Sequence, residues 1–183
     1  MNEIKLVDAC KNGDNTARKK LYELYAQRMM GICFRYTADA EISQDLLHDG
    51  FIKVFESIHS FQYKGENSLC AWMSKIFTNT ALEYLRKSNA RKNVVALDER
   101  LQVEMIEDEK ETDRIPDAVL MNFISELPAG YRTVFNLYTF EEMSHKEIGK
   151  ILGINESSSR SQLARAKLIL AKKINDYIKL NEG

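Results

Sequence analysis

Hydrophobic residues recur at roughly every third or fourth position along most of this chain, which is the spacing of one face of an α-helix. In the first half, three segments show this spacing: residues 10–37, 42–58 and 69–87. A mostly polar stretch, residues 59–68, separates the last two segments. The pattern predicts a helical block that ends near Ala90 and contains one loop. It contains no signal for a β-strand.

A second helical block is expected in the last third of the chain. Asp117 is a suitable N-cap for a short helix over residues 118–127. Pro128 suits the first turn of the next helix, over residues 128–140, because proline lacks the N–H that this turn leaves unpaired.

The segment that follows has the pattern of a helix-turn-helix. Ser144 and Glu147 form a capping box, in which the serine hydroxyl accepts a backbone N–H and the glutamate reaches back. Gly153 can adopt the left-handed conformation that ends a helix, and Asn155 can cap the helix that follows. Two helices joined by such a turn place the second one in the major groove of DNA.

The second helix of this motif, residues 156–173, is cationic. Its one acidic residue is Glu156, against these basic residues: Arg160, Arg165, Lys167, Lys172 and Lys173. One face is expected to form the core stripe: Leu163, Ala166, Leu170 and Ile174. Another face carries polar residues: Ser158, Ser161, Gln162 and Arg165. This segment predicts DNA binding.

The net charge of −1 hides an uneven distribution. Residues 1–92 carry a net charge of +3 and residues 119–183 carry +2, whereas residues 93–118 carry −6. An acidic balance normally argues against nucleic acid, but here the acid is confined to one segment. We interpret residues 93–117 as a flexible acidic linker, with enough apolar residues for part of it to dock on a neighbouring surface.

No catalytic or cofactor-binding pattern is present. The chain has no glycine-rich phosphate loop, no G-x-S-x-G and no H-E-x-x-H. Asp45, His48 and Asp49 lie about one turn apart, but a di-metal bundle needs Glu-x-x-His motifs from several helices. We therefore expect no metal, no other cofactor, no small-molecule substrate and no enzymatic activity.

The remaining composition is that of an ordinary globular protein. Cys10, Cys33 and Cys70 form no C-x-x-C pair, so we interpret them as small buried hydrophobic residues. There is no apolar run of the roughly 18 residues that a membrane span needs, and the amino terminus lacks a signal-peptide core. We expect no membrane insertion and a cytoplasmic location.

Two faces of the first block are candidates for binding. Lys75, Asn79 and Arg86 lie opposite the apolar face of the third helix, after a loop that contains Phe61 and Tyr63. Such a face can follow phosphates and hold unstacked bases; the alternative is a solvated face beside aromatics that close a small core. The second helix displays a polar face, which we interpret as a protein-docking surface: Asp45, His48, Asp49, Ile52 and Lys53.

Taken together, these segments resemble extracytoplasmic-function sigma factors, the compact two-domain class of the bacterial sigma-70 family. Residues 45–55, DLLHDGFIKVF, are similar to the region 2 helix that binds core RNA polymerase, usually D-L-x-Q-E-x-F-x-x-x-[FW], with His-Asp in place of Gln-Glu. Residues 67–86 resemble the promoter-melting stretch with its Trp and Asn. Residues 127–135 resemble the start of region 4, and residues 147–167 its helix-turn-helix.

The resemblance implies an all-α protein with two small helical domains joined by the flexible acidic linker of residues 93–117. Residues 1–92 would be region 2, which binds the β′ clamp helices of core RNA polymerase and reads the −10 element as a single strand. Residues 118–183 would be region 4, which sits on the β flap and reads the −35 element as duplex. Members of the family are commonly held inactive by an anti-sigma factor, so a protein antagonist is implied too.

The resemblance also assigns residues to each contact. The −35 candidates are Ser158, Arg160, Ser161, Gln162 and Arg165, with Arg160 on either a base or a phosphate. The −10 candidates are Phe61, Tyr63, Asn67, Lys75, Asn79 and Arg86, with Phe61 either stacking on a base or part of the core. The polymerase candidates are Asp45, His48, Asp49, Ile52 and Lys53.

Other classes of protein explain less of the sequence. A stand-alone helix-turn-helix regulator would carry a ligand-binding or receiver domain in front, and a receiver alternates strands with helices. A helical adaptor explains the linker but not the cationic second helix. We expect an alternative sigma factor that binds core RNA polymerase and directs promoter-specific initiation, with the stand-alone regulator as the alternative.

Overall fold

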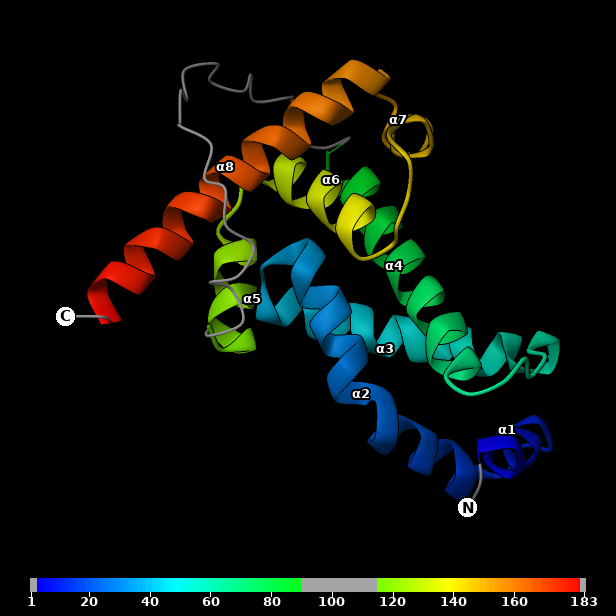
Figure 1. The fold of residues 1–183 in the computed structure, drawn as a ribbon. Coiled ribbons are helices and arrows are strands. Elements are labelled where there is room, and N and C mark those ends of the chain that lie inside the picture. Colours follow the sequence, from blue (N-terminus) through cyan, green and yellow to red (C-terminus); the bar gives the residue numbers. More distant parts are fainter. Residues whose placement is uncertain (1–2, 90–114, 182–183) are drawn as a thin grey trace. The chain divides into compact units, whose positions relative to one another are not determined.

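The computed structural model describes residues 3–89 and 115–181. Within these ranges every regular element is helical, and the helices divide into two compact units, one in each range (Figure 1). The prediction of an all-α protein with two small domains is confirmed. Most of the predicted acidic linker lies outside the described residues.

The first unit is built from four α-helices and one short 3₁₀ helix. They are α1 (Glu3–Lys11), α2 (Asn15–Thr37), α3 (Ala40–Ser57), η1 (Ile58–Ser60) and α4 (Ser68–Asn89). The helices α2, α3 and α4 all contact one another, and α1 contacts both α2 and η1. The three long helices therefore enclose one core, with α1 packed at its edge.

The prediction of one helix over residues 10–37 is wrong at its start, because a turn interrupts the helix between α1 and α2. Gly13 takes a positive φ of 81°, which ends α1. Asp14 then caps α2, and its carboxylate accepts the N–H groups of Thr16 at 2.8 Å and Ala17 at 3.2 Å. The signal for this break is local, an Asn-Gly-Asp turn, and periodicity alone missed it.

The core of the first unit is aromatic where α3 crosses α4. The ring of Phe51 lies 5.3 Å from that of Phe77 and 4.6 Å from that of Tyr22. Gly50 makes this crossing possible, because a Cβ there would lie 2.6 Å from both Cδ1 and Cζ of Phe77. Leu24, an apolar position of the predicted α2 stripe, is instead 60% exposed.

The second unit contains α5 (Asp117–Ser125), α6 (Ala129–Thr139), α7 (His145–Leu152) and α8 (Glu156–Asn181). Asp117 is the first residue of α5 and not its cap, since Pro116 occupies the cap position. Pro128 likewise precedes α6, and its carbonyl accepts the N–H of Arg132 at 2.9 Å. Both predicted helices exist, with their starts displaced by one residue and their ends two residues and one residue earlier than predicted.

One hydrophobic cluster of this unit joins α5, α6 and α8. Its buried members are Ile124, Leu127, Tyr131, Ala166 and Leu170. Arg132 is also buried, and its guanidinium donates to the carbonyl oxygens of Ser125 and Leu127, both at 2.9 Å. These bonds pair the carbonyls at the end of α5 and hold the turn into α6. Burial lowers the pKa of Arg132.

The cysteines, the character of the helices and the acidic and histidine side chains bear on three further expectations. Cys10, Cys33 and Cys70 are free and buried, as predicted. No helix in residues 3–89 or 115–181 has the length and apolar character to span a bilayer. The same part of the chain holds no group of three or more His, Cys, Asp or Glu side chains that could bind a metal.

Candidate functional site

The helix-turn-helix of the second unit begins at the capping box. Ser144 Oγ accepts the N–H of Glu147 at 3.3 Å, and the Ser144 N–H donates to the Glu147 carboxylate at 2.8 Å. The Ser144 hydroxyl also donates to this carboxylate at 2.6 Å. These bonds lower the pKa of Glu147, the hydroxyl having the larger effect. The predicted start of the motif is therefore confirmed.

The turn between α7 and α8 packs against α7 itself. Gly153 has a φ of 69° and donates its N–H to the carbonyl of Gly149, which also accepts the N–H of Ile154 at 3.1 Å. Asn155 caps α8, because its side-chain oxygen accepts the N–H of Ser158 at 2.7 Å. In Figure 1, α7 leads through this turn into α8, which continues as one helix to Asn181.

A polar bridge joins the first turn of α7 to α8. His145 Nδ1 lies 2.9 Å from the hydroxyl of Ser159, which is fully buried. The His145 ring stacks on Tyr138 of α6 with 4.9 Å between centroids, and Lys167 Nζ lies 5.8 Å from the centre of the Tyr138 ring. Side chains of α6, α7 and α8 therefore set the angle at which α8 is presented.

The −35 candidates divide between two flanks of α8. Arg165 donates to the hydroxyl of Tyr131 at 3.3 Å, and Gln162 lies beside Gly130, so both face the start of α6. Ser161 is exposed on the outer surface and Ser158 is half-buried. Arg160 lies on the opposite flank, paired with Glu156 one turn earlier. The sequence placed these five residues on one helix, and the Glu156–Arg160 spacing of four residues was readable in it, but the contact of Arg165 with Tyr131 was not.

The −10 candidates on α4 form one exposed row. Lys75, Asn79 and Arg86 are all exposed, and their directions around the helix axis lie within about 40° of one another. The predicted polar face is therefore present. Leu82, which lies on the same side of α4 by its spacing, is buried.

The loop before α4 separates its two aromatics. Phe61 is 3% exposed, and its ring lies 5.2 Å from that of Trp72, so of the two roles left open for Phe61 the structure shows the core role. Tyr63 is 44% exposed. Asn67 is exposed too and takes a positive φ of 64°, which turns the chain into α4. Tyr63 and Asn67 are the exposed candidates of this loop.

The polymerase candidates lie on the outer face of α3. Asp45, His48 and Asp49 are exposed, and Ile52 among them is 55% exposed. Lys53 differs from the other four, because its ammonium donates to Glu83 of α4 at 3.0 Å. Its structural contribution is to hold α3 against α4.

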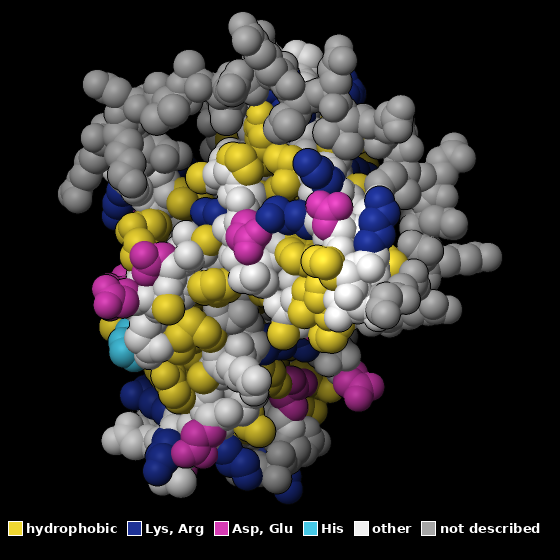
Figure 2. Space-filling view, turned by 90° about the vertical axis from the view of Figure 1, so that its left-hand side faces the viewer, with side chains coloured by type: hydrophobic (Ala, Val, Ile, Leu, Met, Phe, Trp, Pro, Cys, Tyr) yellow, Lys and Arg dark blue, Asp and Glu magenta, His cyan; other side chains and the backbone are white. Residues whose placement is uncertain are grey.

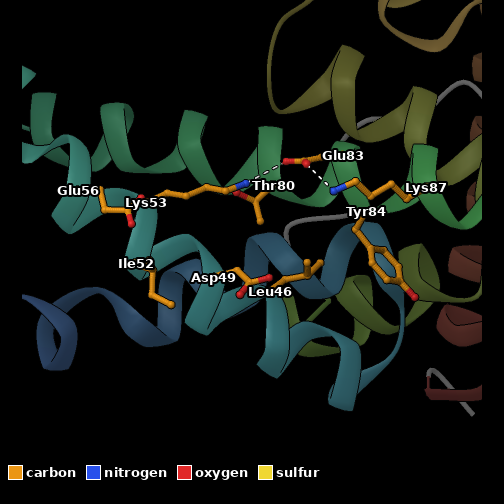
Figure 3. A pocket seen from close by; sticks show the side chains of 9 residues that line it. All are labelled: Leu46, Asp49, Ile52, Lys53, Glu56, Thr80, Glu83, Tyr84 and Lys87. Carbon is orange, nitrogen blue, oxygen red and sulfur yellow. Dashed lines mark hydrogen bonds and ion pairs between the residues drawn. The ribbon is translucent and has the colours of Figure 1, made fainter.

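A groove between α3 and α4 runs beside these residues. Figure 3 shows Glu83 between Lys53 and Lys87, with Asp49 and Ile52 on the opposite wall. Lys87 donates to Glu83 at 2.7 Å, and the hydrogen bonds from Lys87 and then Lys53 lower the pKa of Glu83 to about 2. The Glu83–Lys87 spacing of four residues was readable in the sequence. The bond from Lys53 was not, because it depends on the helix crossing.

The charge of Glu83 should stabilise the first unit in a pH-dependent manner. Its carboxyl has a pKa of about 2 in the folded state against 4.5 ordinarily, so its contribution is present above pH 4.5 and is lost as pH falls toward 2. We expect Glu83→Gln to lower the urea midpoint at pH 7, with a difference from wild type that shrinks between pH 4.5 and about 2.

The exposed Glu66 provides a control, because Glu66→Gln removes a carboxylate from the same unit. Urea unfolding of both variants and the wild type across this range measures the effect. A Glu83→Gln difference that stays constant with pH would contradict the role given to the Lys53–Glu83–Lys87 contacts.

Both units match known protein families. Residues 21–91 match the family model for sigma-70 region 2, and residues 118–170 match the model for sigma-70 region 4. The first match covers α2, α3 and α4, and the second covers α5 to α7 and the first half of α8.

Whole-chain relatives agree with these matches. The ECF RNA polymerase sigma factor SigM of Bacillus subtilis (strain 168) is 27% identical over 151 residues, which cover 81% of this chain and 89% of SigM. The ECF RNA polymerase sigma-E factor of Haemophilus influenzae (strain ATCC 51907 / DSM 11121 / KW20 / Rd) is 27% identical over 180 residues, covering 92% of this chain and 93% of that protein.

Among solved structures, the sigma factor RpoE in complex with the anti-sigma factor NepR from Bartonella quintana aligns with a TM-score of 0.48 and 17% identity, covering 86% of this chain and 96% of that one. The family matches rest on sequence and do not depend on this alignment. Regions 2 and 4 occur here in that order, each on its own helical unit, and the chain therefore belongs to the sigma-70 family, in its extracytoplasmic-function class.

Proposed function

We propose that this chain acts as an alternative sigma factor, which binds core RNA polymerase and directs promoter-specific initiation of transcription. The observation that carries the proposal is the presence of both sigma regions, in order, on two separate helical units. Sigma factors are DNA-binding initiation factors and not enzymes, so no catalytic residues are assigned.

The first unit, with residues 1–92 as its proposed extent, has two roles in this proposal. The exposed face of α3 around Asp49 and Ile52 binds the β′ clamp helices of the polymerase. The row on α4, with Tyr63 and Asn67 of the preceding loop, holds the separated −10 strand. Exposed cations and an exposed aromatic ring support this role, because they suit phosphates and unstacked bases.

The second unit, with residues 118–183 as its proposed extent, sits on the β flap and reads the −35 element as duplex through α8. Residues 93–117 then connect the two units as a linker. The exposed Ser161 and the half-exposed Arg165 support this role for α8, because arginine can pair with guanine in the major groove. We further propose an anti-sigma protein as the antagonist that keeps the chain from the polymerase.

The isolated chain should bind DNA weakly. Figure 2 shows basic, acidic and hydrophobic side chains interspersed on one face, rather than a continuous basic surface. Few phosphate contacts give low, salt-sensitive affinity. Polymerase would hold the two units at a fixed spacing, so that binding of one element raises the effective concentration of the other.

The first test is co-purification with bacterial core RNA polymerase. We expect a stoichiometric complex that is lost on Asp49→Lys and on Ile52→Glu, because both changes place a wrong charge on the proposed docking face. Matched controls lie on α2: Glu23→Lys, with a side chain 61% exposed, and Leu24→Glu, at 60% exposed. No complex with wild type would favour the stand-alone regulator, whereas loss with the controls as well would contradict the assignment of the docking face to α3.

The two units should fail in different steps of initiation. The promoter for this test is selected from fragments of bacterial DNA as one that the holoenzyme transcribes. On that promoter, holoenzyme with Arg165→Ala should discriminate less between bases at one −35 position, by about 1–3 kcal/mol. Arg86→Ala should slow strand opening and leave duplex −35 binding intact. Lys172→Ala, an exposed lysine farther along α8, is the control. Interchanged losses would contradict the roles assigned to the two units.

A further inference from the structure

Helix α1 contacts the start of the loop before α4, although it lies outside the segment that matches region 2. Lys11 Nζ, in the last turn of α1, donates a hydrogen bond to the carbonyl oxygen of Phe61 at 2.8 Å. The two residues are 50 positions apart in sequence. The bond therefore depends on the tertiary fold and cannot be seen in the sequence pattern.

The helix that carries Lys11 is held in place by buried side chains and by a hydrogen bond to α2. Leu6, Val7 and Cys10 of α1 are all buried. The hydroxyl of Tyr25 donates to Glu3 at 2.9 Å and joins the other end of α1 to α2. Burial, together with this bond, raises the pKa of Tyr25 to about 12, so the hydroxyl remains a donor at neutral pH.

Phe61 is the point where the loop leaves the core. Its ring is buried against Trp72, its N–H donates to Ile58 at 3.1 Å, and its carbonyl is held by Lys11. At the far end of the loop, the N–H of Lys64 donates to Ser68 Oγ at 3.2 Å. Between these anchors lies Tyr63, exposed. The direction of the peptide after Phe61 decides where the Tyr63 ring is presented.

We propose that Lys11 is a positioning residue for promoter opening: its charged hydrogen bond to Phe61 orients the loop that presents Tyr63 to the −10 strand. The proposal rests on the proposed function and adds α1 to the strand-binding machinery. A hydrogen bond from a charged donor is stronger than a neutral one. If the loop is already ordered before the DNA strand binds, less conformational entropy is lost on binding.

The test uses holoenzyme made from the full chain and core polymerase. Binding of the non-template −10 strand of a transcribed promoter, labelled with 2-aminopurine, is followed by fluorescence. Lys11→Met, which keeps the length but removes the charge and the donor, should weaken strand binding about tenfold. Lys11→Arg should restore most of it. Lys5→Met removes an exposed lysine from the same helix and should leave strand binding unchanged.

A double-mutant cycle with Tyr63→Ala separates positioning from general destabilisation. If Lys11 acts through the loop, Tyr63→Ala should cost much less in the Lys11→Met background than in wild type. Additive losses, or equal strand binding by Lys11→Met and wild type, would overturn the proposal. Polymerase binding is also measured for wild type and for each variant. If the wild-type chain formed no holoenzyme with core polymerase, the proposed function itself would be refuted, and not only the role of Lys11.

Discussion

Gly50→Ala is expected to destabilise the first unit by about 1–3 kcal/mol, although alanine is the better helix former. The new Cβ would lie 2.6 Å from Cδ1 and Cζ of Phe77, whose ring is fully buried. This ring also packs on Phe51, at 5.3 Å, so it cannot move without disturbing the aromatic core. The helices α3 and α4 would have to separate.

Gly31→Ala provides the matched control on α2. A Cβ at Gly31 meets nothing within 4 Å, so this change should stabilise the unit by up to about 1 kcal/mol. Thermal and urea unfolding of both variants measure the contrast, and polymerase binding should fall with Gly50→Ala because Asp49 and Ile52 flank it on α3. Equal effects of the two substitutions would contradict the close crossing of α3 and α4.

Gly149→Ala should damage the helix-turn-helix and its DNA contact together. A Cβ at this buried position would lie 2.7 Å from the carbonyl oxygen of Ile154, which is backbone of the turn. Backbone cannot rotate away as a side chain can, so the turn must move and α8 with it. We expect a loss of about 1–3 kcal/mol in stability and at least about tenfold weaker −35 duplex binding by the holoenzyme.

The comparison for this change is Gly130→Ala in α6 of the same unit. Its Cβ would meet only the amide oxygen of Gln162, at 3.1 Å, which belongs to a flexible side chain. Unfolding measurements should therefore show a much smaller loss of stability. Unchanged stability and −35 binding for Gly149→Ala would mean that the turn does not set the angle of α8.

Much of the helix-turn-helix could be predicted because its hydrogen bonds are local. Ser144 with Glu147, and Asn155 with Ser158, are three residues apart, so the sequence shows both partners at once. Gly153 follows the same logic, since its conformation is a property of the residue. The break at Asp14 has an equally local signal in Gly13 and Asp14, but hydrophobic periodicity does not carry it.

Roles that depend on a partner from another helix could not be predicted. Phe61 and Tyr63 are two residues apart, yet one ring is buried against Trp72 and the other is exposed. Lys53 was placed correctly on the outer face of α3, but its bond to Glu83 depends on α4. Leu24 has the spacing of the apolar stripe of α2, but within residues 3–89 and 115–181 it is 60% exposed.

The sequence by itself determined that both units are helical, which residues cap α7 and α8, and the order of the two sigma regions. These follow from hydrogen bonds and side-chain spacings within a few residues, which the chain carries wherever it folds. Only the tertiary structure decided which glycine admits a crossing helix, which aromatic ring faces solvent, and that Lys11 reaches the loop at Phe61. Those contacts join residues distant in sequence, and their distances exist only after the helices have packed.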